Sequence, residues 1–261
     1  MEQTPVAESL DADGILTVAL ARPERRNAID AEMQAAIRDA FERAARDREV
    51  RAVILTGEGR AFSAGGDLGR FEHEWDPREF RHDSHQLTQV VSLVERLEKP
   101  TVAAINGVAT GAGTQLALAC DLRIAASGAR FVYREGRLGL IPSHGGCTRL
   151  VKLIGLARAR DVLLGGEELS ADEAHRMGLV TEVVPDGDVM TAARRRLSLM
   201  LERSPQAYAA AKRLLWLAAS VDLESGMVAE GLAQSLLIGT EEHRQGVQAA
   251  RDRLASRRDD R

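Results

Sequence analysis

The sequence predicts an α/β fold, and three features of the chain lead to that prediction. Short runs rich in apolar and β-branched residues alternate with stretches in which apolar residues recur every three or four positions. Glycine-rich turns separate many of these segments. Beyond Pro185 the strand-like runs stop, which predicts a section made only of helices.

The first strand-like run covers residues 14–20 and leads through a turn at residues 22–27 to a helix. Asp30 is expected to cap that helix, because an aspartate oxygen can accept a hydrogen bond from a backbone N–H of the first turn. A short buried strand at residues 53–55, which ends at Gly57, follows the helix. The start of the chain therefore predicts strand, helix and strand.

Residues 69–86 are charged and break this periodicity, so we expect an excursion at the surface that can roof a pocket as a lid. An amphipathic helix is predicted for residues 87–97, before Pro100. A strand at residues 101–105 and a helix that carries residues 116–119 come next.

The domain organisation is expected to have three parts. Residues 1–190 form the core with the ligand site, residues 191–256 form the helical section, and residues 257–261 form a frayed tail without an apolar anchor. Within the helical section, Ser204 is expected to cap a helix that starts at Pro205, and Thr240 is expected to cap a later one.

Composition argues against several classes of function. The chain of 261 residues has 35 Lys and Arg against 39 Asp and Glu, a formal charge of −4, so no basic surplus points to nucleic acid. No run of about 18 apolar residues predicts a membrane helix, and no leader pattern opens the chain, so we expect a cytoplasmic protein. With two cysteines and no clear histidine motif, neither a disulfide framework nor a metal site is expected.

Two glycine-rich turns are candidate ligand sites. Residues 61–68 read AFSAGGDL, and residues 106–115 read NGVATGAGTQ between an apolar strand and a helix. Small residues let the backbone approach a ligand, and the first turn of a helix offers unpaired N–H donors. Such donors suit a phosphate or the oxyanion that forms on a carbonyl. Each turn taken alone is equally consistent with a purely structural role.

Glu135 lies in a mainly apolar, glycine-punctuated stretch, where burial would raise its pKa towards the range of a general base. The alternative is a surface ion pair with Arg134 or Arg137. His144 stands before two glycines at the expected start of a helix, where it can serve as an acid or base or merely as a cap.

Taken together, the motifs resemble those of the crotonase superfamily, the enoyl-CoA hydratase/isomerase family, from about residue 14 onward. The resemblance rests on the order and spacing of short matching segments. They are residues 22–28, 61–68, 106–115, 120–121, 138–142, 145–146, 171–174 and 178–180.

The resemblance implies a spiral core of ββα units, a C-terminal helical section used in trimer contacts within a homotrimer or hexamer, and an acyl-CoA substrate without a metal or redox cofactor. The thioester oxygen would meet the backbone N–H groups of Ala64 and Ala112. Arg25 and Arg26 would meet the phosphates of CoA. Further substrate contacts are expected from Ala28, Gly65, Gly66, Asp67, Leu68 and Ser143.

Hydratases of this family commonly carry two glutamates, and the matching positions here are Gln115 and Glu135. Hydration of a double bond is helped by two groups that handle water, whereas a double-bond shift needs one base. The sequence therefore favours an isomerase in which Glu135 moves the proton. Hydration by Glu135 with Gln115 or His144 remains an alternative, and so does a catalytically silent CoA-binding protein.

Two other classes fit less of the pattern. A serine hydrolase would use Ser63, but Ala61 stands where the G-x-S-x-G motif requires its first glycine. A dinucleotide-binding module would use the turn at residues 111–113, but Leu116 replaces the third glycine of G-x-G-x-x-G.

Overall fold

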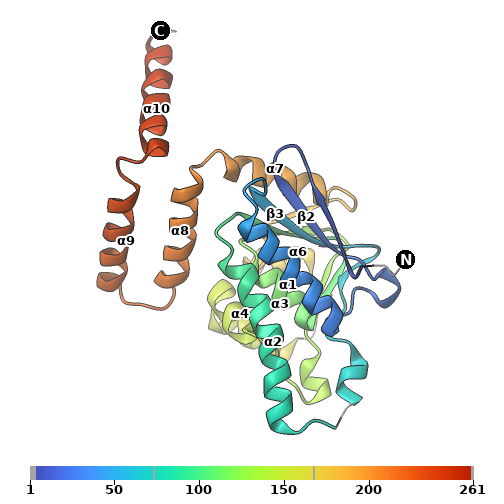
Figure 1. Ribbon diagram of the computed structural model, residues 1–261. Coiled ribbons are helices and arrows are strands. Elements are labelled where there is room, and N and C mark those ends of the chain that lie inside the picture. Colours follow the sequence, from blue (N-terminus) through green and yellow to red (C-terminus); the bar gives the residue numbers. More distant parts are fainter. Residues whose placement is uncertain (1–3, 73, 167, 260–261) are drawn as a thin grey trace. The chain divides into compact units, whose positions relative to one another are not determined.

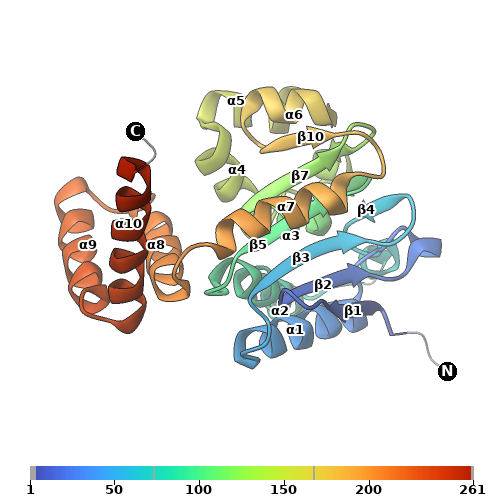
Figure 2. The same cartoon turned by 90° about the horizontal axis from the view of Figure 1, so that it is seen from above.

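The structure is a computed structural model that describes residues 4–72, 74–166 and 168–259, except for the side chains of Phe71 and of residues 256–259. Its larger sheet has six strands in the order β1-β2-β3-β5-β7-β10, and Figure 2 shows them side by side. All neighbours pair in parallel except β1 and β2. The strands are β1 (Val6–Leu10), β2 (Ile15–Leu20), β3 (Ala52–Gly57), β5 (Thr101–Ile105), β7 (Leu122–Ala126) and β10 (Glu182–Val184).

A second, smaller sheet has the order β4-β6-β8-β9. Its strands are β4 (Ala61–Ser63), β6 (Val108–Thr110), β8 (Arg130–Val132) and β9 (Glu168–Ser170). The chain passes three times from a strand of the larger sheet to one of the smaller sheet and then to a helix, as β3-β4-α2, β5-β6-α3 and β7-β8-α4. This repetition confirms the predicted α/β fold of ββα units.

Helices pack against the sheets (Figure 1), and apolar side chains from helices and strands together form the core. Asp30 caps the first of them as predicted, since its side chain accepts a hydrogen bond of 2.9 Å from the N–H of Met33. Helix α3 is apolar around almost its whole circumference and is buried from Ala112 to Ala119. The helices up to residue 177 are α1 (Ala31–Arg46), α2 (Pro77–Arg96), α3 (Gly111–Ala119), α4 (Gly146–Ile154), α5 (Leu156–Arg160) and α6 (Ala171–Met177). Shorter helical turns are η1 (Pro23–Arg25), η2 (Leu68–Glu72), η3 (Glu135–Leu138) and the π-helical η4 (Asp161–Gly165).

The segment at residues 69–86 is more regular than expected. After η2, helix α2 already begins at Pro77, and Asp76 caps it by accepting from the N–H of Arg78. All four buried residues of α2 lie at or beyond Leu87, in its second half. The first half therefore carries no apolar period, which explains why the sequence does not predict this helix.

The C-terminal section is helical, as expected, and forms a compact unit of its own from Leu199 onward. The predicted start at residue 191 falls inside α7 (Val189–Leu201). Three helices follow, α8 (Pro205–Ala218), α9 (Leu223–Leu237) and α10 (Glu241–Asp259).

The predicted caps of this section are present. The Ser204 hydroxyl accepts from the N–H of Ala207, and the Thr240 hydroxyl accepts from the N–H of His243. The predicted frayed tail is corrected in part, because the backbone of residues 257–259 continues α10. Residues 260–261 lie outside the described chain.

Candidate active site

Three loops that follow strands of the smaller sheet meet at one edge of it. β4, β6 and β8 are parallel neighbours, with Ser63 opposite Ala109 and Thr110 opposite Val132. Their carboxyl ends therefore point to the same edge, where parallel α/β sheets bind their ligands. From this edge the chain enters the first glycine-rich turn, the start of α3, and η3.

The two glycine-rich turns touch each other at this edge. Gly65 has a left-handed backbone with φ of +82°, and a Cβ at this position would lie 2.7 Å from the carbonyl oxygen of Thr110. Any other residue here would be strained and would push the two turns apart. Glycine at position 65 therefore serves the close approach of the turns.

The predicted role of Ala64 as an oxyanion donor needs correction. Its N–H already donates a hydrogen bond of 2.8 Å to the carbonyl oxygen of Arg26. A donor that is committed to the backbone cannot also bind a thioester oxygen without losing that bond. Ala64 still lines the cavity with its other atoms.

Gly66 has the free N–H that Ala64 lacks. The residues on either side of it bond to the same neighbour, since the Gly65 oxygen accepts from the N–H of Ile29 and the N–H of Asp67 donates to the oxygen of Ile29. Peptide groups alternate in direction along an extended segment, so the N–H of Gly66 points the other way. Gly66 lines the cavity, and its N–H has no hydrogen-bond partner among the described residues.

Ala112, the other donor that the family resemblance implies, has a backbone N–H at the start of α3. It lies in the first turn of α3, where N–H groups have no acceptor within the helix and the positive end of the helix dipole lies. The residue is 6% exposed and lines the cavity, so its methyl group fits where the family resemblance leads us to expect glycine. Gly66 and Ala112 thus bring two N–H groups to one cavity.

Glu135 opens η3 and lines the same cavity. Burial raises the pKa of its carboxyl group, and its Oε2 atom is buried without a hydrogen-bond partner among the described residues. The alternative, an ion pair of Glu135 with Arg134 or Arg137, is not formed among the described residues, and Arg134 pairs with Glu168 at 3.5 Å. A half-desolvated carboxylate with an unused oxygen is suited to take up a proton.

In the wall of the same cavity, Gln115 and His144 form a hydrogen-bonded pair. The Nδ1 atom of His144 lies 3.2 Å from Oε1 of Gln115 and 2.9 Å from the hydroxyl of Ser143. Its Nε2 atom lies 3.1 Å from the hydroxyl of Ser84 in α2. Both ring nitrogens are thus occupied, and among the described residues that line the cavity Glu135 is the one carboxylate.

The His144 ring stays neutral over the physiological range. Burial and the positive charge of Arg70 lower its pKa to about 4. Arg70, which pairs with Asp83, also has a lowered pKa because it is buried. His144 itself adopts a left-handed backbone with φ of 54°, which is uncommon for a residue with a side chain.

The cavity has a volume of about 140 Å³. Eight of the predicted site residues line it, namely Ala64, Gly66, Leu68, Ala112, Gln115, Glu135, Ser143 and His144. Nine residues that were not predicted as site residues also line it, namely Arg70, Phe80, Leu87, Thr110, Gly111, Arg134, Leu138, Leu140 and Ile141. Arg70 and Phe80 belong to the segment 69–86 that the sequence predicts as the roof of a pocket, and Leu138, Leu140 and Ile141 belong to the glycine-punctuated stretch around Glu135.

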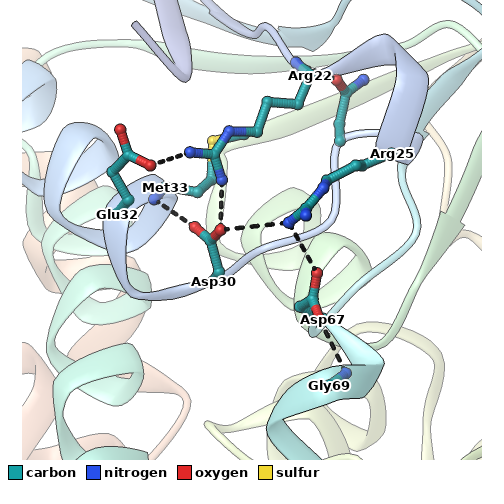
Figure 3. A network of polar contacts seen from close by, with 8 residues as sticks. Arg22, Arg25, Asp30, Glu32, Met33, Asp67 and Gly69 are labelled. Atoms are coloured by element: carbon teal, nitrogen blue, oxygen red, sulfur yellow. Dashed lines mark hydrogen bonds and ion pairs between the residues drawn. The ribbon is translucent and has the colours of Figure 1, made fainter. Parts of the chain in front are cut away.

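The remaining predicted residues lie beside the cavity and not in its wall. Figure 3 shows that Arg25 reaches the carboxylates of Asp30 and Asp67, at 3.9 and 3.4 Å. Asp67 also accepts from the N–H of Gly69, so its side chain holds the turn together. Arg22 ties Asp30 to Glu32 in the same network.

Arg26 differs from its neighbour Arg25 in having no ion-pair partner among the described residues, and it is exposed. Ala28 is half-buried and does not line the cavity. Of the two predicted phosphate contacts, Arg26 is therefore the one whose charge is not already balanced by carboxylates.

The hydrolase reading is not supported by the position of Ser63. Its hydroxyl is fully buried, donates to the carbonyl oxygen of Asn27 at 2.7 Å and accepts from the N–H of Gly65. Ser63 thus has a structural role in the turn. Elsewhere in the described chain, no group of three or more His, Cys, Asp or Glu side chains is placed to hold a metal ion. Within the same residues, no helix is both long and apolar enough to cross a membrane.

Comparison with known proteins gives a consistent result. A sequence model of the enoyl-CoA hydratase/isomerase family matches residues 11–257. The chain is 35% identical over 235 residues to the 2,3-dehydroadipyl-CoA hydratase of Escherichia coli K12, covering 90% of this chain and 91% of that protein. It is 34% identical over 241 residues to the 1,2-epoxyphenylacetyl-CoA isomerase of the same organism, again covering 90% and 91%. A crystal structure of an enoyl-CoA hydratase from Bacillus anthracis superposes with a TM-score of 0.90 at 32% identity, covering 95% and 96% of the two chains.

Proposed function

The chain belongs to the enoyl-CoA hydratase/isomerase family of acyl-CoA-processing enzymes, and from this premise we propose that it shifts the double bond of a 3-enoyl-CoA. Glu135 is the single acid–base group in this proposal. One observation carries it: among the described residues the cavity wall holds one carboxylate, which has an unpartnered oxygen, and Gln115 in the same wall is a neutral amide bonded to a neutral histidine.

The reaction needs only groups that line the cavity. Glu135 removes a proton from C2 of the substrate, and the electrons of the C–H bond enter the thioester as an enolate. The N–H groups of Gly66 and Ala112 stabilise the enolate oxygen, each contributing roughly 3–4 kcal/mol to the transition state. The same carboxyl group then returns the proton to C4, and the double bond moves to C2–C3.

Recognition of the CoA part is proposed for Arg26. An exposed guanidinium without a competing carboxylate is suited to a phosphate group. Arg25 is 59% exposed and close to two carboxylates, so its contribution is expected to be smaller.

Hydration of a 2-enoyl-CoA is the second candidate. Several relatives are hydratases by name. Ser143 and His144 stand next to Gln115 in the wall of the cavity, where polar groups can hold a water molecule. In that case protonated Glu135 would deliver its proton to C2 while water adds at C3, and the proton that the water loses would return to Glu135.

We also propose that the chain assembles into a homotrimer or hexamer through its C-terminal helices. Neither α8 nor α9 contains a buried residue among those described, and both carry large apolar side chains. Leu215, Leu223 and Leu236 are 74%, 80% and 79% exposed. Apolar surface of this kind is typical of an interface, and light scattering coupled to size-exclusion chromatography measures the number of subunits directly.

Product analysis with a matched pair of substrates tests the proposed reaction. The protein is incubated separately with a 2-enoyl-CoA and with the corresponding 3-enoyl-CoA. We expect the 3-enoyl-CoA to be converted to the 2-enoyl-CoA and no hydroxyacyl-CoA to accumulate. Formation of 3-hydroxyacyl-CoA as the main product from both substrates would assign the chain to the hydratases instead.

A further inference from the structure

A line of hydrogen bonds connects the first half of α2 to the catalytic cavity. It runs from the hydroxyl of Ser84 to Nε2 of His144 at 3.1 Å, and from Nδ1 of His144 to Oε1 of Gln115 at 3.2 Å. Its three members come from α2, from the loop before α4 and from α3, so the contacts form only in the folded chain.

The chemistry of the last member sets the direction of every bond in the line. Oε1 of Gln115 has no hydrogen, so it can only accept, and Nδ1 of His144 must carry the proton. In a neutral imidazole the other nitrogen then has a lone pair, which accepts from the hydroxyl of Ser84. Ser143 lies 2.9 Å from the same Nδ1 and can share its proton. The carboxamide of Gln115 is thereby fixed with its Nε2 end away from His144.

The Nε2 end of Gln115 has no hydrogen-bond partner among the described residues, although Gln115 is only 4% exposed. Its side chain is held against the backbone of Gly146, where a Cβ would lie 3.1 Å from Nε2. A residue with a side chain at position 146 would displace the amide. Gln115 lines the cavity, so the partner missing from its two N–H groups is expected to come from the ligand.

The helix fixes which part of the ligand these N–H groups meet. Gln115 follows Ala112 by three residues in α3, which places it on the same face and about 4.5 Å further along the axis. When the thioester oxygen meets the N–H of Ala112 and the acyl chain runs along this face of α3, the atoms two bonds beyond the carbonyl carbon come within reach of the Gln115 amide. These atoms are C3 and its substituents.

We propose that Ser84 and His144 are positioning residues that hold Gln115 as a hydrogen-bond donor to an oxygen atom on or next to C3 of the acyl chain. The proposal rests on the proposed function in that Ala112 must bind the thioester. The oxygen has two sources, a substituent of the acyl chain or a water molecule, and both present the same lone pair to Gln115.

A pair of ligands that differ in one oxygen tests the proposal. The dissociation constants of 3-hydroxybutyryl-CoA and butyryl-CoA are measured by calorimetry on the full-length protein. One hydrogen bond corresponds to a preference of about fivefold to tenfold for the hydroxylated ligand. Ser84→Ala is expected to abolish most of this preference and to leave the affinity for butyryl-CoA within about twofold, because one missing hydroxyl lets the imidazole and the amide turn.

Three further variants make the result specific. Ser84→Thr keeps the hydroxyl and is expected to restore the preference. Thr88→Ala removes another hydroxyl of the same helix. This hydroxyl donates to the carbonyl oxygen of Ser84, and the variant is expected to behave like the unchanged protein. His144→Gly removes the ring at a position where the positive φ favours glycine, and it is expected to lose the preference as Ser84→Ala does.

Three results would overturn the proposal. They are the absence of any preference in the unchanged protein, a preference that survives in both Ser84→Ala and His144→Gly, and an equal loss of affinity for both ligands, which would indicate a merely structural role. Incubation with crotonyl-CoA separates the two sources of the oxygen. If the unchanged protein hydrates crotonyl-CoA and Ser84→Ala does so more slowly, the oxygen is that of a water molecule. If the unchanged protein does not hydrate crotonyl-CoA but still prefers 3-hydroxybutyryl-CoA, the oxygen belongs to the acyl chain. Exchange of the C2 protons of butyryl-CoA in D2O tests the proposed function independently, since it depends on Glu135 and not on an oxygen at C3.

Discussion

Two sets of polar groups in the cavity wall, Glu135 on the one hand and Gln115 with His144 on the other, differ in what they can do with a proton. Glu135 carries a carboxyl group with a raised pKa and an oxygen without a partner. Gln115 and His144 line the same cavity as neutral groups, with Oε1 of Gln115 bonded to His144 and His144 bonded to Ser84. Glu135 is therefore suited to exchange protons, whereas Gln115 and His144 are suited to orient a ligand. One base is enough for an isomerase, whereas hydratases of the family commonly use two carboxylates.

The largest effect is expected from removing the base. Glu135→Gln keeps the shape of the side chain but cannot accept a proton, so the rate of double-bond isomerisation should fall by about 10³-fold or more. Turnover of a 3-enoyl-CoA measures this loss. A fall of less than about tenfold would mean that the proton moves through another group.

The oxyanion donors stabilise the enolate whichever group moves the proton, so their loss should slow every reaction of the site. Ala112→Pro removes the N–H in the first turn of α3, where proline is tolerated, and should lower kcat by about 10²- to 10³-fold. Ala112→Gly retains the N–H and is the matched control, with activity expected within a few-fold of the unchanged protein. Equal activities of the two variants would remove Ala112 from the oxyanion hole.

Replacing Gln115 by a second carboxylate tests whether the difference between Gln115 and Glu135 decides the reaction. Gln115→Glu places a second carboxylate in the cavity that Glu135 lines and should raise hydration of a 2-enoyl-CoA by at least about tenfold, because two groups can then share the protons of water. Gln115→Leu has a similar size without polar atoms and should show no such gain. Hydration is followed by the appearance of 3-hydroxyacyl-CoA. A Gln115→Glu variant that hydrates no faster would show that the missing carboxylate is not what limits this reaction.

A smaller and pH-dependent effect should follow from the titration of Glu135. Because burial raises its pKa above the usual value of 4.5, kcat/KM should rise with pH until this raised pKa is passed. His144 contributes nothing above its pKa of about 4, so one ionisation should describe the acid limb. A second ionisation near pH 6.5, lost in a His144→Gly variant, would contradict the assigned neutral state of the ring.

The same raised pKa predicts the smallest effect, on stability. A carboxyl group whose pKa is higher in the folded state binds more protons there, so its contribution favours folding at low pH and is lost as pH rises through the folded pKa. Replacing Glu135 by Gln should therefore raise the Tm more at pH 7 than at pH 4.5. Thermal unfolding of the two proteins at both pH values provides the measurement, and an equal change at both would contradict the shift.

The parts of the site that follow from local chain chemistry could be predicted from the sequence. The strands, the glycine-rich turns and the caps Asp30 and Ser204 depend on residues a few positions apart. The direction of a backbone N–H after a turn does not, so the sequence could not show that the N–H of Ala64, which the family resemblance implies as a donor, is bonded to Arg26 while that of Gly66 is free.

Contacts between distant segments could not be predicted from the sequence either. Ser84 and His144 are 60 positions apart, and Ser84 lies in the first half of α2, which shows no apolar period. Ser84 is not unusual in its own segment. Only the folded chain shows that the segment expected as a lid also contacts His144, which is bonded to Gln115 in the cavity wall.

Proton exchange from solvent tests the account's central claim most directly. Butyryl-CoA is incubated in D2O with the unchanged protein, with Glu135→Gln and with Gln115→Leu, and deuterium at C2 is followed by NMR. We expect incorporation with the unchanged protein and with Gln115→Leu, and a loss of about 10³-fold or more with Glu135→Gln. Exchange that persists in Glu135→Gln, or that depends on Gln115 instead, would contradict the assignment of the proton to Glu135.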